Sequence, residues 1–233
     1  SELNIKTVQS IDEIPRGSVV IIRAHGAPPS TFNQATAKGL TIVDASCPLV
    51  LKSHQTVNKN SGQNKKIVFL CNNITHDETV GVVGEDPYSV IPVALTDVPN
   101  LDIPDPKNCL VMTQTTLSTL ETKESLDFLK NKYPEVTIMP HICQATTDRQ
   151  KAIIELSKSC SLVIIVGAPT SANSNSLKKV AESSGATSYI VDNVTELDPK
   201  WFIGHENIAI SSGASTPETI LEVVIEEIKN III

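Results

Sequence analysis

Short, nearly continuous apolar runs rich in β-branched residues recur along the chain, and they limit its possible folds more than any other feature. We predict strands at 18–23, 67–71, 109–112, 162–166 and 207–210, and weaker ones at 41–44, 136–139 and 188–191. Runs of this kind are typical of parallel strands that are covered on both faces. Helical periodicity is found between them at 48–59, 119–132, 145–158, 174–183 and 217–229. The alternation predicts an α/β protein with parallel sheets.

A faint internal repeat runs through these elements. In each copy a strand ends in a polar corner, a helix follows, and a second strand ends in another corner. The copies run from "AHGAPPS" to "TIVDASC", from "TQTTLS" to "TIMPHIC" and from "GAPTSANSNS" to "SYIVDNV". In register, Cys47 and Cys143 coincide, whereas the third copy has Val194. Because ligands of open parallel sheets bind beyond the carboxyl ends of the strands, we expect three similar lobes whose corners meet at one central site.

Composition excludes several classes of function. The net charge is −7, with 19 Lys and Arg against 26 Asp and Glu, and a protein that binds a phosphate backbone needs the opposite balance. We therefore expect no nucleic-acid partner. No apolar run approaches the roughly 20 residues of a membrane-spanning helix, and no signal peptide opens the sequence. We expect a cytoplasmic protein without a membrane partner.

The five cysteines divide into two groups. Their odd number and wide spacing do not indicate a disulfide framework. Cys71, Cys109 and Cys160 lie in or beside apolar strands, where we expect them to be buried as small hydrophobic residues. Cys47 and Cys143 instead lie at matching strand-to-helix corners, where the positive end of a helix favours the thiolate.

Two cysteines at matching strand-to-helix corners indicate that both bind the same metal centre. A nucleophile would need a base, which His25 or His141 could supply, but a single nucleophile does not explain two matching cysteines. Two thiolates brought together by two lobes are more typical of an iron-sulfur cluster or a zinc site. Coincidental burial of both cysteines is the alternative that spacing alone leaves open.

The remaining corners have the composition of an anion site. Hydroxyl and amide side chains precede helix starts in "TSANSNS", "GAST" and "TQTT", and helix N-termini bind phosphate without needing Lys or Arg. Any one of these corners is explained as simple helix capping, but the whole set favours a ligand. His25, at the end of an apolar strand, can donate to a phosphate oxygen, or it is a half-buried histidine without a ligand.

One corner carries the only obvious acid. His76 and Glu78 in "NNITHDET" are close enough in sequence to share a site, and Glu78 is the candidate proton carrier. The alternative for Glu78 is a solvated carboxylate at a helix start.

Seven motifs in order resemble one known family. They are "AHG" (24–26), "VDASCPLV" (43–50), "THDETVG" (75–81), "MTQTTLS" (112–118), "ICQATTDRQ" (142–150), "VGAPTSANSNSL" (166–177) and "SSGASTPE" (211–218). The set is similar to 4-hydroxy-3-methylbut-2-enyl diphosphate reductase, the IspH or LytB family, over essentially the whole chain. The resemblance implies a trefoil of three pseudo-symmetric α/β lobes with small parallel sheets around a central iron-sulfur site. We place the lobes at 1–46, which is partial, 47–141 and 142–233.

The resemblance also implies an activity, the last step of the non-mevalonate isoprenoid route. An allylic diphosphate loses its 4-hydroxyl group in a two-electron, two-proton reduction that gives isopentenyl and dimethylallyl diphosphate. Ferredoxin or flavodoxin supplies the electrons, and three cysteines hold a [4Fe-4S] cluster. By position, Cys47 and Cys143 are cluster ligands and Glu78 is the proton source, assisted by Thr115 and His76. The diphosphate is held by His25, Ser171, Asn173 and Ser215, with His76 and Thr115 also at the substrate.

The chain departs from the family pattern in three places. The family opens with a "GFC" motif that carries the first cluster cysteine, whereas this sequence begins at a position after it, so we expect the sequence to be a fragment. None of Cys71, Cys109 and Cys160 falls at a matching corner as a third ligand. Ala172 replaces a serine of the diphosphate pocket, and the usual "HPEVEG" is "HDETVG". The alternative to a reductase is therefore a non-catalytic paralogue or fragment that binds a diphosphate but holds no intact cluster.

Overall fold

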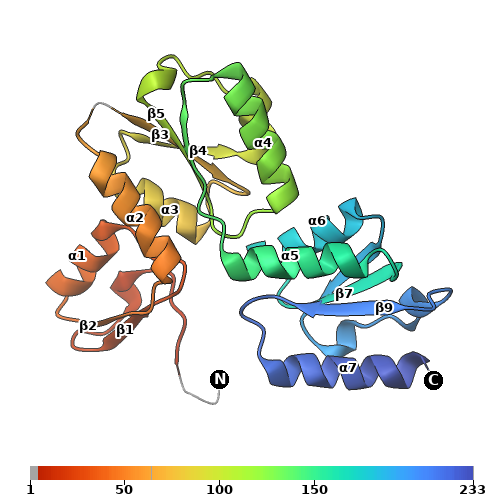
Figure 1. Ribbon diagram of the computed structural model, residues 1–233. Coiled ribbons are helices and arrows are strands. Elements are labelled where there is room, and N and C mark those ends of the chain that lie inside the picture. Colours follow the sequence, from red (N-terminus) through yellow and green to blue (C-terminus); the bar gives the residue numbers. More distant parts are fainter. Residues whose placement is uncertain (1–4, 64, 233) are drawn as a thin grey trace. The chain divides into compact units, whose positions relative to one another are not determined.

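Three separate parallel sheets form the framework of the protein (Figure 1). The computed structural model describes residues 5–63 and 65–232. The first sheet pairs β1 (Val19–Ile22) with β2 (Thr41–Asp44). The second has the order β4 (Val90–Ala94), β3 (Lys66–Cys71), β5 (Cys109–Thr113), β6 (Thr137–Met139), and the third has the order β8 (Thr187–Val191), β7 (Leu162–Val166), β9 (Ile208–Ser212). The predicted α/β class with small parallel sheets is confirmed.

Helices alternate with the strands along the chain. They are α1 (Pro29–Ala37), α2 (Pro48–Asn60), α3 (Asp77–Val83), α4 (Thr119–Lys132), α5 (Gln144–Leu156), α6 (Ala172–Ser183) and α7 (Glu218–Ile232). All five predicted helices and all eight predicted strands are present, with ends shifted by at most three residues. The helix α1 was expected from the repeat alone, between "AHGAPPS" and "TIVDASC" and without bounds, whereas α3 and the strand β4 were not predicted.

The described residues form two compact units. The first comprises the chain up to Gln114 together with Leu129–His141, and the second comprises Thr115–Phe128 together with the chain from Ile142 onward. The boundaries of the three expected lobes, at residues 46/47 and 141/142, stay a prediction. Each unit is described below by itself.

The larger sheet of the first unit is buried on the face that α2 and α3 cover. Phe69 of β3 and Met112 of β5 are fully buried and lie in one cluster with Val57 of α2 and Val82 of α3. Each such side chain contributes about 1.5–3 kcal/mol to folding through removal of apolar surface from water. Every residue of β3 after Lys66 is buried, so both of its faces are covered, which explains its continuous apolar sequence.

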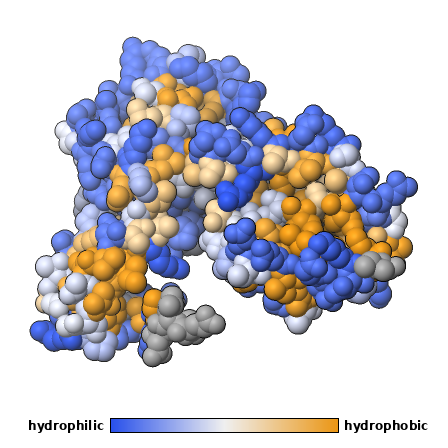
Figure 2. All heavy atoms as spheres, turned by 60° about the horizontal axis from the view of Figure 1, so that its bottom comes forward, coloured by the Kyte–Doolittle hydropathy of each residue, from blue (hydrophilic) through white to orange (hydrophobic). Residues whose placement is uncertain are grey.

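The small β1–β2 sheet is covered on one face only. Ala35 of α1 packs there with Leu40, and Val20 and Ile42 of the two strands lie against this cluster. Val19, Ile21 and Val43 point to the other face and are 47–62% exposed. In the space-filling view apolar side chains gather on this part of the molecule (Figure 2).

The sheet of the second unit lies between helices on both faces. Val163 and Ile165 of β7 pack on one side against α5 and α6 through Ile153 and Leu177. The alternate residues of β7 form the opposite cluster with α7. Figure 1 shows α5 and α6 on one side of this sheet and α7 on the other. In the described part of the chain, no helix is long and apolar enough to cross a membrane.

Candidate functional site

The predicted polar corners follow the strands at which the sheet order reverses. In the second sheet β3 is followed by β4 on one side and by β5 on the other, and in the third sheet β7 has the same relation to β8 and β9. Crevices at the carboxyl ends of such strand pairs are the usual ligand sites of parallel sheets. The corners after β3 and β5 carry "NNITHDET" and "QTTLS", and those after β7 and β9 carry "GAPTSANS" and "GASTPE". Both larger sheets thus place their polar motifs at their switch points.

Cys47 and Cys143 occupy equivalent positions. Each is the N-cap of a helix, α2 or α5, with φ/ψ of −61°/134° for Cys47 and −67°/132° for Cys143. Neither side chain caps its helix, and both are half-buried free thiols. The amide of Cys47 donates to the carbonyl of Ala24, 3.0 Å away, and that of Cys143 donates to the carbonyl of Thr115, 2.9 Å away. The repeat between these two copies therefore extends to the hydrogen bond that fixes each cysteine.

The other three cysteines are buried, as predicted. Cys71 ends β3, Cys109 begins β5, and Cys160 lies just before β7. Burial raises the pKa of the Cys71 and Cys109 thiols, which disfavours the thiolate that a metal requires. Within residues 5–63 and 65–232, no group of three or more His, Cys, Asp or Glu side chains is placed to hold a metal ion. Each corner thiol is of the kind that binds a metal as a thiolate, but the described residues do not complete the ligand set of a metal.

His25 and His76 form a close pair in the first unit. Their rings meet edge to face, with centroids 5.1 Å apart and an interplanar angle of 85°. His25 lies in the corner after β1, and His76 is the N-cap of α3. Burial is the main cause that lowers the pKa of both, and the nearby charge of Arg23 lowers each further while Asp77 opposes this. Both imidazoles are therefore held neutral at physiological pH.

Glu78 is buried rather than solvated. It is the second residue of α3 and only 1% exposed, so the alternative of a solvated carboxylate at a helix start is wrong. The adjacent Asp77 is exposed and pairs instead with Arg23. Burial keeps the Glu78 side chain out of contact with bulk water. This position suits a group that holds a proton away from bulk water.

Thr115 lies in the second unit and is 5% exposed. Its corner is held by Gln150 of α5, which is fully buried. The Gln150 side chain accepts from the amide of Thr119, 2.7 Å away, and donates to the carbonyl of Leu117 and to Ser176 Oγ, each 3.0 Å away. The helix that begins at Cys143 thus fixes the corner that contains Thr115.

The corner after β7 has the features of an anion site. Ser171 is the N-cap of α6 and accepts from the amide of Ser174, 3.3 Å away. Asn173 and Ser174 are 6% and 0% exposed, and in the described structure Asn173 Nδ2 and Ser174 Oγ have no hydrogen-bond partner. Buried polar groups are nearly always satisfied, so unpaired donors at a helix N-terminus indicate a missing acceptor.

Two glycines let the backbone approach these donors closely. A side-chain carbon on Gly213, in the corner after β9, would lie 2.7 Å from Ser174 Oγ and 3.9 Å from Asn173 Nδ2. One on Gly167, in the corner after β7, would lie 2.5 Å from Ser174 Oγ. Ser215, two residues beyond Gly213, is exposed in the same corner. The second unit therefore brings Ser171, Asn173 and Ser215 to one switch point.

Sequence reasoning missed Gln114, Gln150, Ser174 and His54. Both glutamines lie inside quoted motifs, "MTQTTLS" and "ICQATTDRQ", but their partners are 26 to 42 residues away in sequence. A signal for Ser174 was present in the density of hydroxyl groups in "TSANSNS". For His54 no pattern in the sequence indicates its contacts.

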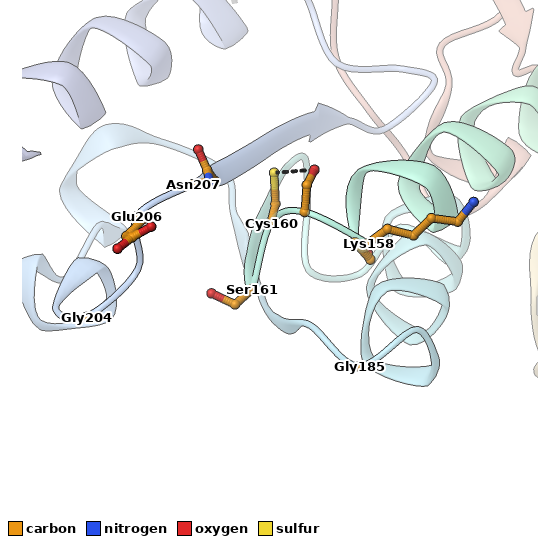
Figure 3. A pocket seen from close by; sticks show the side chains of 9 residues that line it. Lys158, Cys160, Ser161, Gly185, Gly204, Glu206 and Asn207 are labelled. Carbon is orange, nitrogen blue, oxygen red and sulfur yellow. Dashed lines mark hydrogen bonds between the residues drawn. The ribbon is translucent and has the colours of Figure 1, made fainter.

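A pocket on the second unit lies away from this switch point (Figure 3). Cys160 and Ser161 precede β7 and Asn207 precedes β9, so the pocket is at the amino ends of the strands. Lys158, Gly185, Gly204 and Glu206 complete its labelled wall. Its position opposite the polar corners separates it from the candidate site.

Comparisons with known proteins agree with this geometry. Over 232 residues the chain is 35% identical to the 4-hydroxy-3-methylbut-2-enyl diphosphate reductase of Xanthomonas oryzae pv. oryzae (strain PXO99A), covering 96% of this chain and 73% of that protein. The solved E-1-hydroxy-2-methyl-but-2-enyl-4-diphosphate reductase of Plasmodium falciparum aligns with a TM-score of 0.88 at 32% identity, covering 94% of this chain and 70% of that one.

A second solved structure is that of (E)-4-hydroxy-3-methyl-but-2-enyl diphosphate reductase, the terminal enzyme of the non-mevalonate pathway. It aligns with a TM-score of 0.60 at 30% identity and covers 95% of this chain and 79% of that one. These likenesses confirm the predicted fold class. The sequence also matches the LytB protein family over residues 1–229. The chain therefore belongs to the LytB family.

Proposed function

We propose that the chain catalyses the reductive dehydroxylation of (E)-4-hydroxy-3-methylbut-2-enyl diphosphate to isopentenyl and dimethylallyl diphosphate, the last step of the non-mevalonate pathway. The observation that carries the proposal is the 35% identity to a reductase over 96% of the chain. The reaction breaks the allylic C–O bond and consumes two electrons and two protons. One proton leaves with the hydroxyl group as water, and the other is added to the carbon skeleton.

Cys47 and Cys143 are proposed as two ligands of a [4Fe-4S] cluster. Their support is the shared N-cap geometry, the free thiols and the positive helix end beside each. Only Cys47 and Cys143 lie at such corners in this sequence, so the third cysteine ligand of the family has no counterpart among its five cysteines. When bound, such a cluster supplies the electrons and a Lewis-acidic iron for the hydroxyl oxygen. We propose ferredoxin or flavodoxin as donor and the reducing cytoplasm as location.

The chain's own residues handle the protons. Glu78 is proposed to deliver a proton to the leaving hydroxyl group, because it is the buried acid of the corner after β3. Thr115 and His76 are proposed to assist, Thr115 through its hydroxyl group and His76 as a neutral hydrogen-bond donor. A water-excluded acid avoids loss of the proton to solvent before the C–O bond breaks.

The diphosphate is proposed to bind at the polar corners. Ser171, Asn173 and Ser215 come from the switch point of the third sheet, and the unpaired Nδ2 of Asn173 supplies a donor. His25 and His76 supply imidazole donors from the first unit. Fixed dipoles and helix N-termini hold an anion without lysine or arginine and position the allylic end of the substrate.

A second candidate function is a non-catalytic member of the family that binds the diphosphate alone. Two observations favour it: within the described residues the ligand set of a metal is incomplete, and Ala172 stands where the family pattern has a serine. The two candidates differ in whether the protein holds a cluster, which is directly measurable.

The deciding experiment is anaerobic iron-sulfur reconstitution of the protein expressed from its whole reading frame. Iron and sulfide contents near four per chain and turnover of the allylic diphosphate with a reduced dye are expected for the reductase. Protein that takes up no iron but binds pyrophosphate would identify the non-catalytic candidate. Cys143→Ser should lose the cluster, whereas Cys160→Ser, at a buried cysteine outside the corners, should retain it. Glu78→Gln should keep the cluster absorbance and lose most turnover.

A further inference from the structure

We propose that Gln114 is a positioning residue that holds His76 in the neutral tautomer with its proton on Nε2, so that His76 presents a donor to the diphosphate. The part about the diphosphate rests on the proposed function. The part about the tautomer rests on hydrogen bonds within the first unit alone.

The orientation of the Gln114 amide is fixed by the backbone. Gln114 is fully buried at the end of β5. The backbone N–H of Asn72, at the end of the neighbouring β3, donates to Gln114 Oε1 at 3.2 Å. An N–H group can only donate, so the side-chain oxygen must face Asn72 and the side-chain nitrogen must face the other way.

That nitrogen faces His76. Gln114 Nε2 lies 3.2 Å from His76 Nδ1. An amide nitrogen has no acceptor lone pair, so Nδ1 must accept the hydrogen bond and cannot carry a proton. The order of donors is therefore Asn72 N–H to Gln114, and Gln114 to His76.

A second donor points to the same ring atom. His76 is the N-cap of α3, and the backbone N–H of Glu78 donates to His76 Nδ1 at 3.2 Å. Protonation of Nδ1 would set its proton against two N–H groups, so the imidazolium and the other tautomer are both disfavoured. The only proton of the neutral ring then lies on Nε2.

The charged and titratable groups around the His76 ring either lower its pKa, and so also favour the neutral form, or offset one another. His25 meets the ring edge to face, and repulsion between the two rings when protonated lowers the pKa of His76 further. Arg23 also lowers it, Asp77 raises it, and these two side chains are paired with each other. Glu78 is the remaining acid of the corner, with its backbone N–H directed to His76. The hydrogen bond from Gln114 and that from the Glu78 amide therefore act together on His76 Nδ1.

The test is a direct measurement of the tautomer. In protein labelled with ¹⁵N-histidine, two-bond ¹H–¹⁵N correlation spectra distinguish Nδ1–H, Nε2–H and imidazolium forms, and a His76→Gln variant assigns the signal. Wild-type protein should show His76 as the Nε2–H tautomer. Gln114→Glu reverses the bond, because a carboxylate accepts from Nδ1–H, and should move His76 to the Nδ1–H or imidazolium form.

Two further variants make the result interpretable. Gln114→Met retains the length of the side chain but cannot donate, and it should give a mixture of tautomers; it serves also if the buried charge of Gln114→Glu prevents folding. Gln34→Glu adds the same charge at an exposed position of α1 and should leave His76 unchanged. A wild-type Nδ1–H tautomer, or a His76 signal unaffected by both Gln114 variants, would overturn the positioning role.

The substrate-facing part has its own readout. Inorganic pyrophosphate should bind Gln114→Met several-fold more weakly than wild type, while Gln34→Glu binds it normally. Loss of the tautomer without a change in pyrophosphate affinity would refute the role at the diphosphate and leave the tautomer assignment intact. Neither the tautomer spectrum nor the measurement of pyrophosphate binding requires turnover, so failure of the proposed reductase activity does not affect this test.

Discussion

Removing the Gln150 side chain should destabilise the second unit by an amount that the structure sets. Gln150 is fully buried and makes three hydrogen bonds, of 2.7, 3.0 and 3.0 Å, to Thr119, Leu117 and Ser176. At about 1 kcal/mol net for each bond, Gln150→Ala should lower the free energy of unfolding by about 3 kcal/mol. The backbone groups of Thr119 and Leu117 would also be left without these partners, which raises the cost.

The single tryptophan provides the assay. Trp201 belongs to the second unit and stacks on Tyr189 with ring centroids 4.0 Å apart, so its fluorescence reports on this unit. With a dependence of about 1–3 kcal/mol per molar urea, the unfolding midpoint should fall by roughly 1–3 M. Lys151→Ala, at the exposed neighbouring position of α5, is the matched control and should shift the midpoint little.

A glutamate at the same position separates hydrogen bonding from packing. Gln150→Glu retains an acceptor for the Thr119 amide but, when ionised, loses both donations to Leu117 and Ser176. Its destabilisation should decrease in acid, where a protonated carboxyl can donate once more. If Gln150→Ala unfolds within about 0.5 kcal/mol of the wild type, the reasoning from buried hydrogen bonds is refuted.

Three further predictions concern single groups. Burial lowers the pKa of His25 and His76, so below the ordinary pKa of about 6.5 the unfolded chain binds more protons than the folded one. The free energy of unfolding of the first unit should therefore decrease as the pH is lowered, by up to about 1.4 kcal/mol for each histidine and each pH unit. Amide exchange in β3 measured between about pH 7 and 5 checks this, and a flat profile would contradict it. Ala172→Ser should restore a hydroxyl group at the start of α6 and lower KM for the diphosphate about tenfold, with kcat little changed; an unchanged KM would remove this position from the pocket. Gly84→Ala would place a carbon 2.3 Å from Pro28 Cβ and should lower the free energy of unfolding by about 1–3 kcal/mol, measured by thermal denaturation. A melting temperature equal to that of the wild type would contradict this prediction and show that the backbone around Pro28 moves to accommodate the methyl group.

The strands were predictable because the central ones are buried on both faces. β3, β5 and β7 read as continuous apolar runs, and their burial confirms the reason for this pattern. β4 was missed because Pro92 interrupts "VIPVA". Its position explains the proline, because β4 is the edge strand of its sheet, and an edge strand tolerates a residue without an N–H group.

The two helices that periodicity did not reveal, α1 and α3, lack a strong apolar face. α1 buries only Ala35 in a mostly polar segment, and α3 has only seven residues, too few for a clear period. Tertiary contacts stabilise both, α1 through the β1–β2 sheet and α3 through β3 and β5. Local sequence patterns cannot reveal an element whose stability comes from partners elsewhere in the chain.

In the candidate site, too, residues with a local sequence pattern were predictable and residues defined by distant contacts were not. The corner cysteines and hydroxyl residues were predictable, because their type and their place between strand and helix define the chemistry. The residues that hold them were not, because glutamine at a corner has no distinctive pattern. Gln114 joins β3 to α3, and Gln150 joins α5 to the start of α4 and to α6, each through side-chain bonds between distant segments.

His54 shows how one buried ring sets the spacing of several site corners. It lies in α2, the helix that begins after Cys47, and its Nδ1 is 2.7 Å from Glu85 Oε1 just beyond α3. A side-chain carbon on Gly26 would lie 3.1 Å from His54 Nε2, and one on Gly81 would lie 3.2 Å from Cε1. Gly26 follows His25, and Gly81 is three residues after Glu78. The backbones of both corners therefore approach the same imidazole, and a side-chain carbon at either glycine would crowd the ring. The position of Cys47 relative to His25 and Glu78 consequently depends on a histidine that takes no part in the proposed chemistry.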